Sequence, residues 1–384
     1  LIRRRYKISF LLLNNTDTAK HRKNKNLNPE NINFFEIKKL DYSIPDNKRS
    51  IYKKIFYPKL EDYFPTCNEQ NRLKKIIHEI SPKFLLTIWD EKATNMIYLS
   101  PIKKICYYGN PLSKNFSVIL DRQLSKTNFF SKVFLYIKNL FHKYQFKKFH
   151  FEIIQKIDFL FNVSLLDSKF YSNNNIDCQY INFIYKSSYS LKKIKSIKTQ
   201  ISSKNKIKIT GNVGNLNGTA NTLGLKYLIK EVFPELKKLD LNFEIHLFGS
   251  GNVEEYIKEF SIKNNELKVR GFVKDIDKEI CNSNIFLCCN NATTYNVGHT
   301  RYLHAFSLGT CVVAHKNLSV VMPEMIDKVN CCLEDSPKNI ACVIKDLSRD
   351  ISLAKKIGLE GYQTLIKDFS TKRAVNTMID KIKI

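Results

Sequence analysis

The side chains best placed to do chemistry lie in the stretch YNVGHTRYLHAFSLGTCVVAH. Gly298 precedes a predicted helix, so the backbone amides of His299 and Thr300 can point at a phosphate bound at the helix start. Arg301 and His304 are three residues apart and share one helix face. An arginine in the first turn opposes the helix dipole, and an anion held by its guanidinium would explain it. The stretch predicts an anion site, with a solvated arginine and a packed histidine as the alternatives.

Two glycine-rich loops follow predicted strands earlier in the chain. GNVGNLNGTANTLG spans 211–224, and FGSGN spans 248–252. Glycine lets the backbone approach a ligand closely, and the free N–H groups of a following helix attract an anion. Both loops are therefore candidate ligand-binding loops. Ordinary strand–helix turns are an equally open interpretation, and no Gly-Lys-Ser/Thr follows the first loop to make it a P-loop.

A third loop, GFVKD, places Phe272 and Val273 at the end of a predicted strand. Apolar groups and backbone at this position can stack on and hydrogen-bond a base. All these loops follow the carboxyl ends of predicted strands, where parallel sheets bind their ligands.

The elements that position these loops alternate regularly along the second half of the chain. Uniformly apolar strands are typical of a parallel sheet covered on both faces. The predicted strands are 206–212, 242–251, 267–273, 285–290, 311–315 and 331–334. The predicted helices are 220–239, 253–264, a short one after 273, 299–309, a helical turn at MPEMID and the region from about 336 onward.

The first half shows a looser version of the same pattern. Its predicted strands are 6–14, 31–39, 84–90, 103–109, 157–164 and 178–185, and its predicted helices are 68–80 and 129–153. A basic, serine-rich stretch with little apolar signal follows and predicts a linker. The sequence thus predicts an α/β protein with two Rossmann-like, doubly wound parallel-sheet domains facing a cleft. We place an N-terminal domain at 1–190, a linker at 191–205 and a C-terminal domain at 206–384.

The charge is large and uneven. The net charge is +27, of which +21 falls in residues 1–200 and +6 in residues 201–384. The predicted helix 129–154 interleaves Phe, Tyr, Leu and Ile with Lys, which favours docking on an anionic membrane surface. The alternative is a helix with one buried face and a solvated basic side. No apolar run approaches the roughly 18 residues that span a bilayer.

Ten cysteines are scattered along the chain without a Cys-x-x-Cys motif. This pattern favours buried, reduced thiols over a metal site or disulfides. We therefore expect a cytoplasmic protein, peripheral on the inner face of the membrane if the basic helix docks there.

At this point the order of elements in residues 205–384 resembles the C-terminal domain of GT-B glycosyltransferases, specifically the family 4 (group 1) enzymes. GNVG is similar to the glycine loop that opens this domain. IHLFGSG, VRGFVKD, VGHTRYLHAFSLGTCVVAH, MPEMIDKVNCCL and DFSTKRAVNTMIDKI resemble its later segments in the same order. Each motif is weak by itself, and six in the right order make the resemblance specific.

The resemblance implies a nucleotide diphosphate sugar donor held mainly by the C-terminal half. In that family the glycine loop lines the donor site, the third loop faces the base, and the helix after the fourth loop holds the diphosphate. The implied donor-binding residues are Gly211, Asn212, Gly249, Phe272, Val273, Gly298, His299, Thr300, Arg301 and His304.

Two departures from the family pattern affect the candidate catalytic residues. The family's paired glutamates lie eight apart, and here those positions hold Asn296 and His304. A histidine can still hydrogen-bond a ribose hydroxyl, whereas Asn296 can contact the sugar without carrying charge. In the N-terminal half, CYYGNP occupies the place where an acceptor-side strand ends, which makes Tyr108 and Asn110 further catalytic candidates. We also expect this domain to lack its first strand, and the last helix to pack back on it.

These observations predict a hexosyltransferase-like enzyme that moves a sugar from a nucleotide diphosphate donor to a glycan or lipid-linked acceptor in surface polysaccharide synthesis. No cofactor and no metal cluster are expected, so Arg301 and helix N-termini would stabilise the departing diphosphate. One alternative is a non-catalytic GT-B scaffold, which the replaced glutamates favour. The other is a basic nucleic-acid-binding protein. It lacks a recognition motif, so we expect no nucleic-acid partner.

Overall fold

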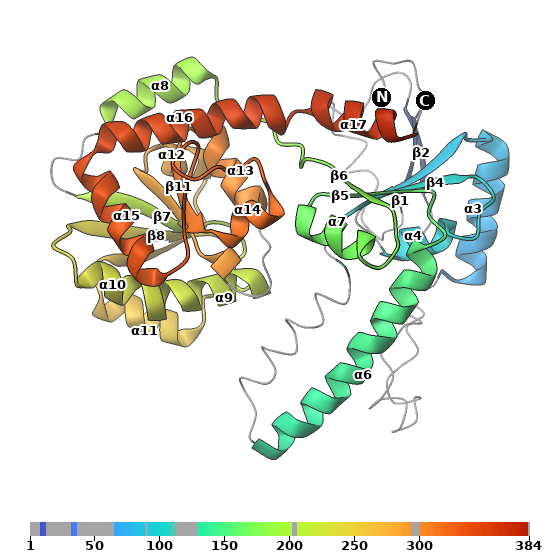
Figure 1. Ribbon diagram of the computed structural model, residues 1–384, viewed down its shortest axis with the longest axis horizontal. Helices are drawn as coiled ribbons and strands as arrows, with labels where there is room; N and C mark the ends of the chain where they lie inside the picture. Colours follow the sequence, from blue (N-terminus) through green and yellow to red (C-terminus); the bar gives the residue numbers. More distant parts are fainter. Residues whose placement is uncertain are drawn as a thin grey trace. The chain divides into compact units, whose positions relative to one another are not determined.

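The computed structural model describes residues 8–12, 32–36, 65–88, 91–109, 111, 129–201, 206–292 and 299–382. The chain forms two compact units (Figure 1). The N-terminal unit comprises Leu1–Asn162, Ser168–Gln179 and Lys381–Ile384. The C-terminal unit comprises Val163–Asp167 and Tyr180–Asp380. The end of the chain thus groups with the N-terminal unit, where Lys381 pairs with Asp177.

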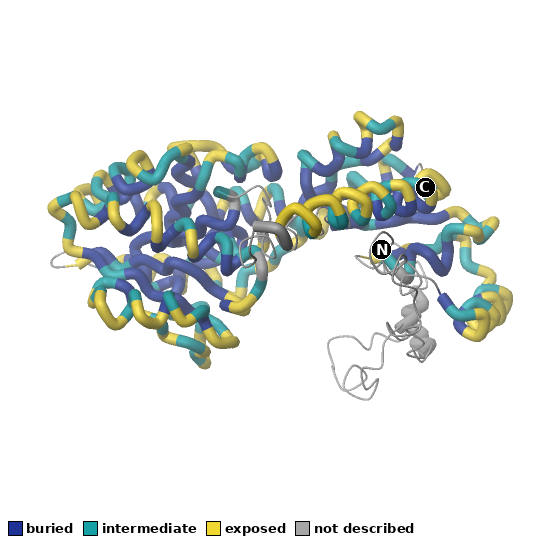
Figure 2. Tube along the Cα trace, turned by 90° about the horizontal axis from the view of Figure 1, so that it is seen from below, coloured by how far each residue is buried: buried dark blue, intermediate teal, exposed yellow. Residues whose placement is uncertain are grey.

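The C-terminal unit contains a six-stranded parallel sheet in the order β12-β11-β10-β7-β8-β9. Its strands are β7 (Ile207–Asn212), β8 (Phe243–Phe248), β9 (Leu267–Gly271), β10 (Ile285–Cys288), β11 (Cys311–His315) and β12 (Cys332–Glu334). In β10, Ile285 and Leu287 pack in one core cluster and Phe286 and Cys288 in the other. Both faces of the sheet are therefore covered, as the uniformly apolar strands predicted, and the strands form the dark core in Figure 2.

Helices of this unit divide between the two faces. Buried residues of α9 (Thr219–Tyr227), η5 (Leu228–Val232), α10 (Phe233–Lys237), α11 (Glu255–Lys263) and α15 (Pro337–Arg349) join the first core cluster. Those of α12 (Ile276–Cys281), α13 (His299–Ser307) and α14 (Asn317–Val321) join the second. The long α16 (Ile351–Asp368) contributes to both clusters, and α17 (Thr371–Ile382) follows it.

Two predicted helices differ from the structure. The helix predicted at 220–239 contains a π-helical segment, which ends just before Pro234, a residue without an N–H for the helical ladder. The helical turn predicted at MPEMID is wrong: the helix α14 ends at Val321, and the following residues form turns. An isolated bridge between Asp327 and Cys331 closes this segment.

The N-terminal unit contains a four-stranded sheet in the order β3-β4-β5-β6 and a separate parallel pair, β1-β2. The strands are β1 (Ile8–Leu12), β2 (Ile32–Glu36), β3 (Phe84–Ile88), β4 (Lys103–Tyr108), β5 (Phe159–Asn162) and β6 (Cys178–Tyr180). The helices are α3 (Cys67–Ile80), α4 (Glu91–Ile97), α6 (Phe129–Ile154) and α7 (Leu165–Ser172). A capping box fixes the start of α3, where Thr66 and Glu69 satisfy each other's backbone N–H groups.

The predicted linker at 191–205 contains a helix, α8 (Leu191–Gln200). The Ser190 hydroxyl caps it by accepting from the Lys193 N–H at 3.3 Å. Ile194 and Lys198 lie one turn apart and are buried inside the C-terminal unit, to which α8 belongs. The sequence shows little apolar signal here because half of this buried face is a lysine.

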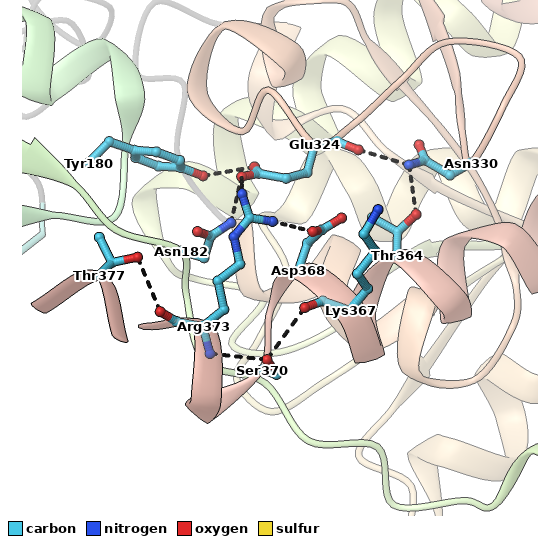
Figure 3. A network of polar contacts seen from close by, with 10 residues as sticks. All are labelled: Tyr180, Asn182, Glu324, Asn330, Thr364, Lys367, Asp368, Ser370, Arg373 and Thr377. Atoms are coloured by element: carbon cyan, nitrogen blue, oxygen red, sulfur yellow. Dashed lines mark hydrogen bonds and ion pairs between the residues drawn. The ribbon is translucent and has the colours of Figure 1, made fainter. Parts of the chain in front are cut away.

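A carboxylate ties together three segments of the C-terminal unit (Figure 3). Glu324 accepts hydrogen bonds from the Tyr180 hydroxyl at 2.8 Å and from the Asn182 amide. Arg373 of α17 lies 3.8 Å from the same carboxylate and also pairs with Asp368. The carboxylate therefore holds Tyr180 and Asn182 against the turn between α16 and α17.

Candidate functional site

The strand order places a topological switch point between β7 and β10. The connection after β7 enters α9 on one face of the sheet, and the connection after β10 leads to α13 on the other face. Loops that diverge in this way leave a crevice at the carboxyl ends of the two strands, which is where open α/β sheets bind ligands. Both loops were candidates from the sequence.

The loops that follow β7, β8 and β9 are fastened to one another. A Cβ atom on Gly249 would lie 1.6 Å from the carbonyl oxygen of Gly214, and Gly249 has a φ of +146°. Leu216 N–H donates to the Ser250 carbonyl at 2.9 Å, and Gly249 N–H donates to the Gly271 carbonyl at 2.8 Å. Gly249 is thus required for contact between the loops.

Two buried asparagines fix the first loop to the end of β10. The Asn290 amide donates to Asn221 at 3.0 Å, and the Asn221 amide donates to the Asn215 carbonyl. Asn221 and Asn290 are 0% and 2% exposed. Buried amides with satisfied partners hold a loop in a single conformation. The loop motif contained Asn221, but nothing in the sequence singled it out from its neighbours.

Arg301 connects α13 to the first loop. Its Nε donates to the Val213 carbonyl at 2.8 Å, and its guanidinium lies beside Gly214, where a Cβ atom would come within 3.5 Å of Nη2. Among the described residues no carboxylate pairs with Arg301, and its two Nη groups have no hydrogen-bond partner. The guanidinium is therefore positioned by one N–H and keeps its fork for an anion.

Two further polar groups near this loop are buried and unpaired. Asn212 is 1% exposed; its Oδ1 accepts from the Val213 N–H at 2.8 Å, while its Nδ2 has no partner among the described residues. The Thr222 hydroxyl on α9 is likewise buried without a partner in the described part of the chain. Buried donors without partners are costly, and they are found where a ligand or water completes the site.

Gly211 has a packing role that the loop pattern did not indicate. It is a buried residue of β7, and a Cβ atom there would lie 2.4 Å from the Ile245 side chain. The absence of a side chain is therefore required by strand packing, which corrects the interpretation of Gly211 as a loop glycine open to a ligand.

His304 is paired with a residue that the sequence analysis did not single out. Its Nε2 lies 2.6 Å from Oδ1 of Asp277 on α12, and the Ser188 hydroxyl donates to the other oxygen of that carboxylate. Burial raises the pKa of Asp277, but the hydrogen bonds from Ser188 and His304 outweigh it and lower that pKa overall. His304 therefore connects α13 with α12, and the structure gives it a carboxylate partner rather than an open ring.

The third loop presents a large apolar side chain to solvent. Phe272 is 80% exposed, whereas Val273 is partly buried against the second core cluster. Gly271 before them has a φ of +67° and turns the chain at the end of β9. An exposed phenylalanine at this edge can stack on a flat ring.

Of the three predicted catalytic residues, the structure describes only Tyr108. Tyr108 is 2% exposed and packs in the N-terminal core beside His150, with ring centroids 5.3 Å apart. Burial raises the pKa of Tyr108 well above its usual value. A hydroxyl so placed cannot reach a substrate, so the expected catalytic role is not supported. Asn110, Asn296 and Gly298 lie outside the described residues.

The start of α13 is described only in part. His299 begins the helix, and Thr300 beside it is exposed. This exposure leaves Thr300 accessible to a ligand at the helix start.

Comparison with known proteins identifies the segment that contains these loops. Residues 207–350 match the family model of Glycosyl transferases group 1, which is the segment that contains all the loops described above. No curated protein matches the sequence significantly.

Solved structures with a similar fold cover both units. HepE from Anabaena, crystallised with UDP and glucose, is 12% identical with a TM-score of 0.58, and the match covers 98% of this chain and 99% of HepE. TarM from S. aureus is 14% identical with a TM-score of 0.58, covering 81% of this chain and 58% of TarM. Sucrose-phosphate synthase from Thermosynechococcus elongatus is 12% identical with a TM-score of 0.58, covering 91% and 82%.

Proposed function

We propose that this chain, whose residues 207–350 form a group 1 glycosyltransferase domain within a GT-B fold, transfers a sugar from a nucleotide diphosphate sugar to a glycan or lipid-linked acceptor. The observation that carries the proposal is Arg301, held by a backbone carbonyl at the switch point with its Nη groups unpaired. HepE was crystallised with UDP-glucose, and TarM with UDP and an oligosaccharide, which favours this substrate class.

The loops around Arg301 suggest how the donor would be held. The diphosphate would lie against the guanidinium and the free N–H groups at the start of α13, with the base toward Phe272. The buried donors of Asn212 and Thr222 would gain acceptors from the same ligand. Because Arg301 is fixed before the donor binds, its charge would stabilise the diphosphate as it leaves, without a metal ion.

The donor site can be tested by calorimetric titration of the full chain with UDP, GDP and ADP. We expect one nucleotide to bind, and Arg301→Ala to weaken it by about 10–100-fold, the effect of losing charge-assisted hydrogen bonds. Arg301→Lys should recover only part of the affinity because an ammonium lacks the fork. Arg349→Ala, an exposed arginine at the end of α15, is the matched control. If the folded chain binds none of the three nucleotides, the glycosyltransferase proposal is contradicted and the non-catalytic GT-B scaffold remains.

The helix α6 supports a peripheral membrane contact for the same enzyme. Its first half exposes seven apolar side chains, each between 45% and 65% accessible: Val133, Phe134, Tyr136, Ile137, Leu140, Phe141 and Tyr144. At 100° per residue they share one side of the helix, with Lys132, Lys138 and Lys143 at its borders. The opposite side carries Phe146 and Phe149 into the N-terminal core.

This exposed stripe fits an anionic membrane better than solvent. Apolar side chains can enter the acyl boundary while the bordering lysines reach phosphate headgroups. Docking there would bring the enzyme to a lipid-linked acceptor in surface polysaccharide synthesis on the cytoplasmic face. Within the described residues, no helix is long and apolar enough to cross a bilayer.

A further inference from the structure

Lys198 is a cation buried far inside the contact between α8 and the C-terminal sheet. It is 5% exposed, and its Nζ donates to the Ser283 carbonyl at 3.2 Å and to the Thr310 hydroxyl at 2.8 Å. The Thr310 hydroxyl in turn donates a hydrogen bond to the Ile280 carbonyl at 2.9 Å. All of these acceptors are neutral, so the hydrogen bonds orient the ammonium group without compensating its charge.

The surroundings of Lys198 add a second cation and no anion. Lys355 of α16 donates to the Ile201 carbonyl at 3.0 Å and lies close enough to act on Lys198. Within the described ranges, no carboxylate forms an ion pair with either lysine. The nearby thiols of Cys281 and Cys311 are neutral at pH 7, because burial raises the pKa of the first, and a hydrogen bond with Cys332 and burial raise that of the second. An uncompensated buried charge is expensive.

A small cavity joins these groups. Its volume is about 10 Å³, and Lys198, Lys355 and Asn284 are among the residues that line it. Asn284 is 8% exposed; its Oδ1 accepts from the Lys208 N–H at 2.9 Å, and its Nδ2 is buried with no partner among the residues that the structure describes. The cavity is thus bordered by two ammonium groups and one unused amide donor, and it holds a single particle about the size of a water molecule.

We propose that this cavity binds one small monovalent anion of the halide class, which compensates Lys198 and secures α8 to the C-terminal unit. The anion would accept from Lys198 Nζ and Asn284 Nδ2, with Lys355 adding charge from the rim. A water molecule would satisfy the hydrogen bonds but leave both cations uncompensated. The site is separate from the proposed donor site and does not depend on the proposed function.

The test is thermal unfolding of the full chain in sodium chloride, bromide or gluconate at constant ionic strength. We expect chloride and bromide to raise the melting temperature of the wild type by about 2–4 °C in a saturable way relative to gluconate. Lys198→Met should abolish the difference. The control Lys195→Met removes an exposed lysine from the same helix and should keep it.

A second variant keeps the test decisive if Lys198→Met folds poorly. Asn284→Asp retains an oxygen for the Lys208 N–H and places a carboxylate where the unpaired amide was. It should melt higher than the wild type in gluconate and lose the halide response. The proposal is overturned if the wild type melts at the same temperature in all three salts. It is also overturned if Asn284→Asp keeps the halide response. In either case the cavity would hold a water molecule rather than an anion.

Discussion

The two units share a parallel α/β architecture but place their polar and apolar residues in opposite ways. In the C-terminal unit, buried asparagines and closely packed glycines at the strand ends fasten the loops after β7 and β8 to each other and to the end of β9. In the N-terminal unit, the long helix α6 exposes seven apolar side chains between lysines. The C-terminal unit thus presents a fixed backbone at its strand ends, and the N-terminal unit presents a surface of side chains. A substitution should therefore damage one kind of recognition and spare the other.

The largest effect is expected for Gly249→Ala, because the new methyl group would collide with the Gly214 carbonyl and the φ of +146° is unfavourable for alanine. Urea denaturation should show a loss of about 3–5 kcal/mol, and nucleotide binding should disappear. Gly271→Ala is the matched control: its φ is also positive, at +67°, but nothing lies within 4 Å of its added Cβ. It should cost about 1 kcal/mol. Equal losses in the two variants would show that the loops do not touch.

The next prediction distinguishes the two units by the pH dependence of stability, because each contains a buried basic group with a lowered pKa. Burial lowers the pKa of His150, which packs with Tyr108 and Tyr171 in the N-terminal core, from 6.5 to about 4. Burial and Lys355 lower the pKa of Lys198 from 10.5 to about 8. In both cases the unfolded chain binds the proton more tightly. Stability should therefore fall as pH drops from 6.5 to 4, and rise as pH increases from 8 to 10.5, by up to about 3 kcal/mol each.

Urea denaturation of two variants as a function of pH shows which residue causes the change in stability in each range, the acid window of pH 4–6.5 and the alkaline window of pH 8–10.5. His150→Phe should flatten the acid window alone, and Lys198→Met the alkaline window alone. Variants at exposed positions, His78→Phe and Lys195→Met, should leave both windows unchanged. A wild-type profile that is flat from pH 8 to 10.5 in gluconate would mean that the ammonium group of Lys198 is compensated by the protein itself.

The contrast between the units also explains what the sequence could predict. The strands at the centre of the C-terminal sheet were predicted because they are apolar on both faces, as Phe286 and Leu287 of β10 illustrate. Arg301 was predicted because a cation in a first helical turn needs a reason. The helix α8 was missed because its buried face includes Lys198, whose burial depends on acceptors far along the chain. The pair His304–Asp277 was missed because its two residues are 27 positions apart in the sequence and lie on different helices.

The third prediction concerns α6. Ile137→Ser combined with Leu140→Ser removes two side chains that are 45% and 47% exposed, each of which can still bury about half its surface in a membrane. Co-sedimentation with vesicles containing phosphatidylglycerol should weaken by roughly 30-fold, or about 2 kcal/mol. Nucleotide binding should not change. Leu99→Ser, on another exposed leucine of the N-terminal unit, is the control, and an equal loss for that variant would exclude α6 as the docking surface.

The smallest effect is expected for Glu324→Gln. The amide keeps the size of the side chain, which is 8% exposed, but loses the charge that Arg373 faces and one acceptor for Tyr180 and Asn182. Urea denaturation should show a loss of about 1–2 kcal/mol, and Glu360→Gln on the exposed side of α16 should show none. Hydrogen exchange should accelerate at 180–182 and stay unchanged in β3 to β5. Faster exchange in those strands as well would mean that Glu324 stabilises more than the C-terminal unit, which would contradict the prediction.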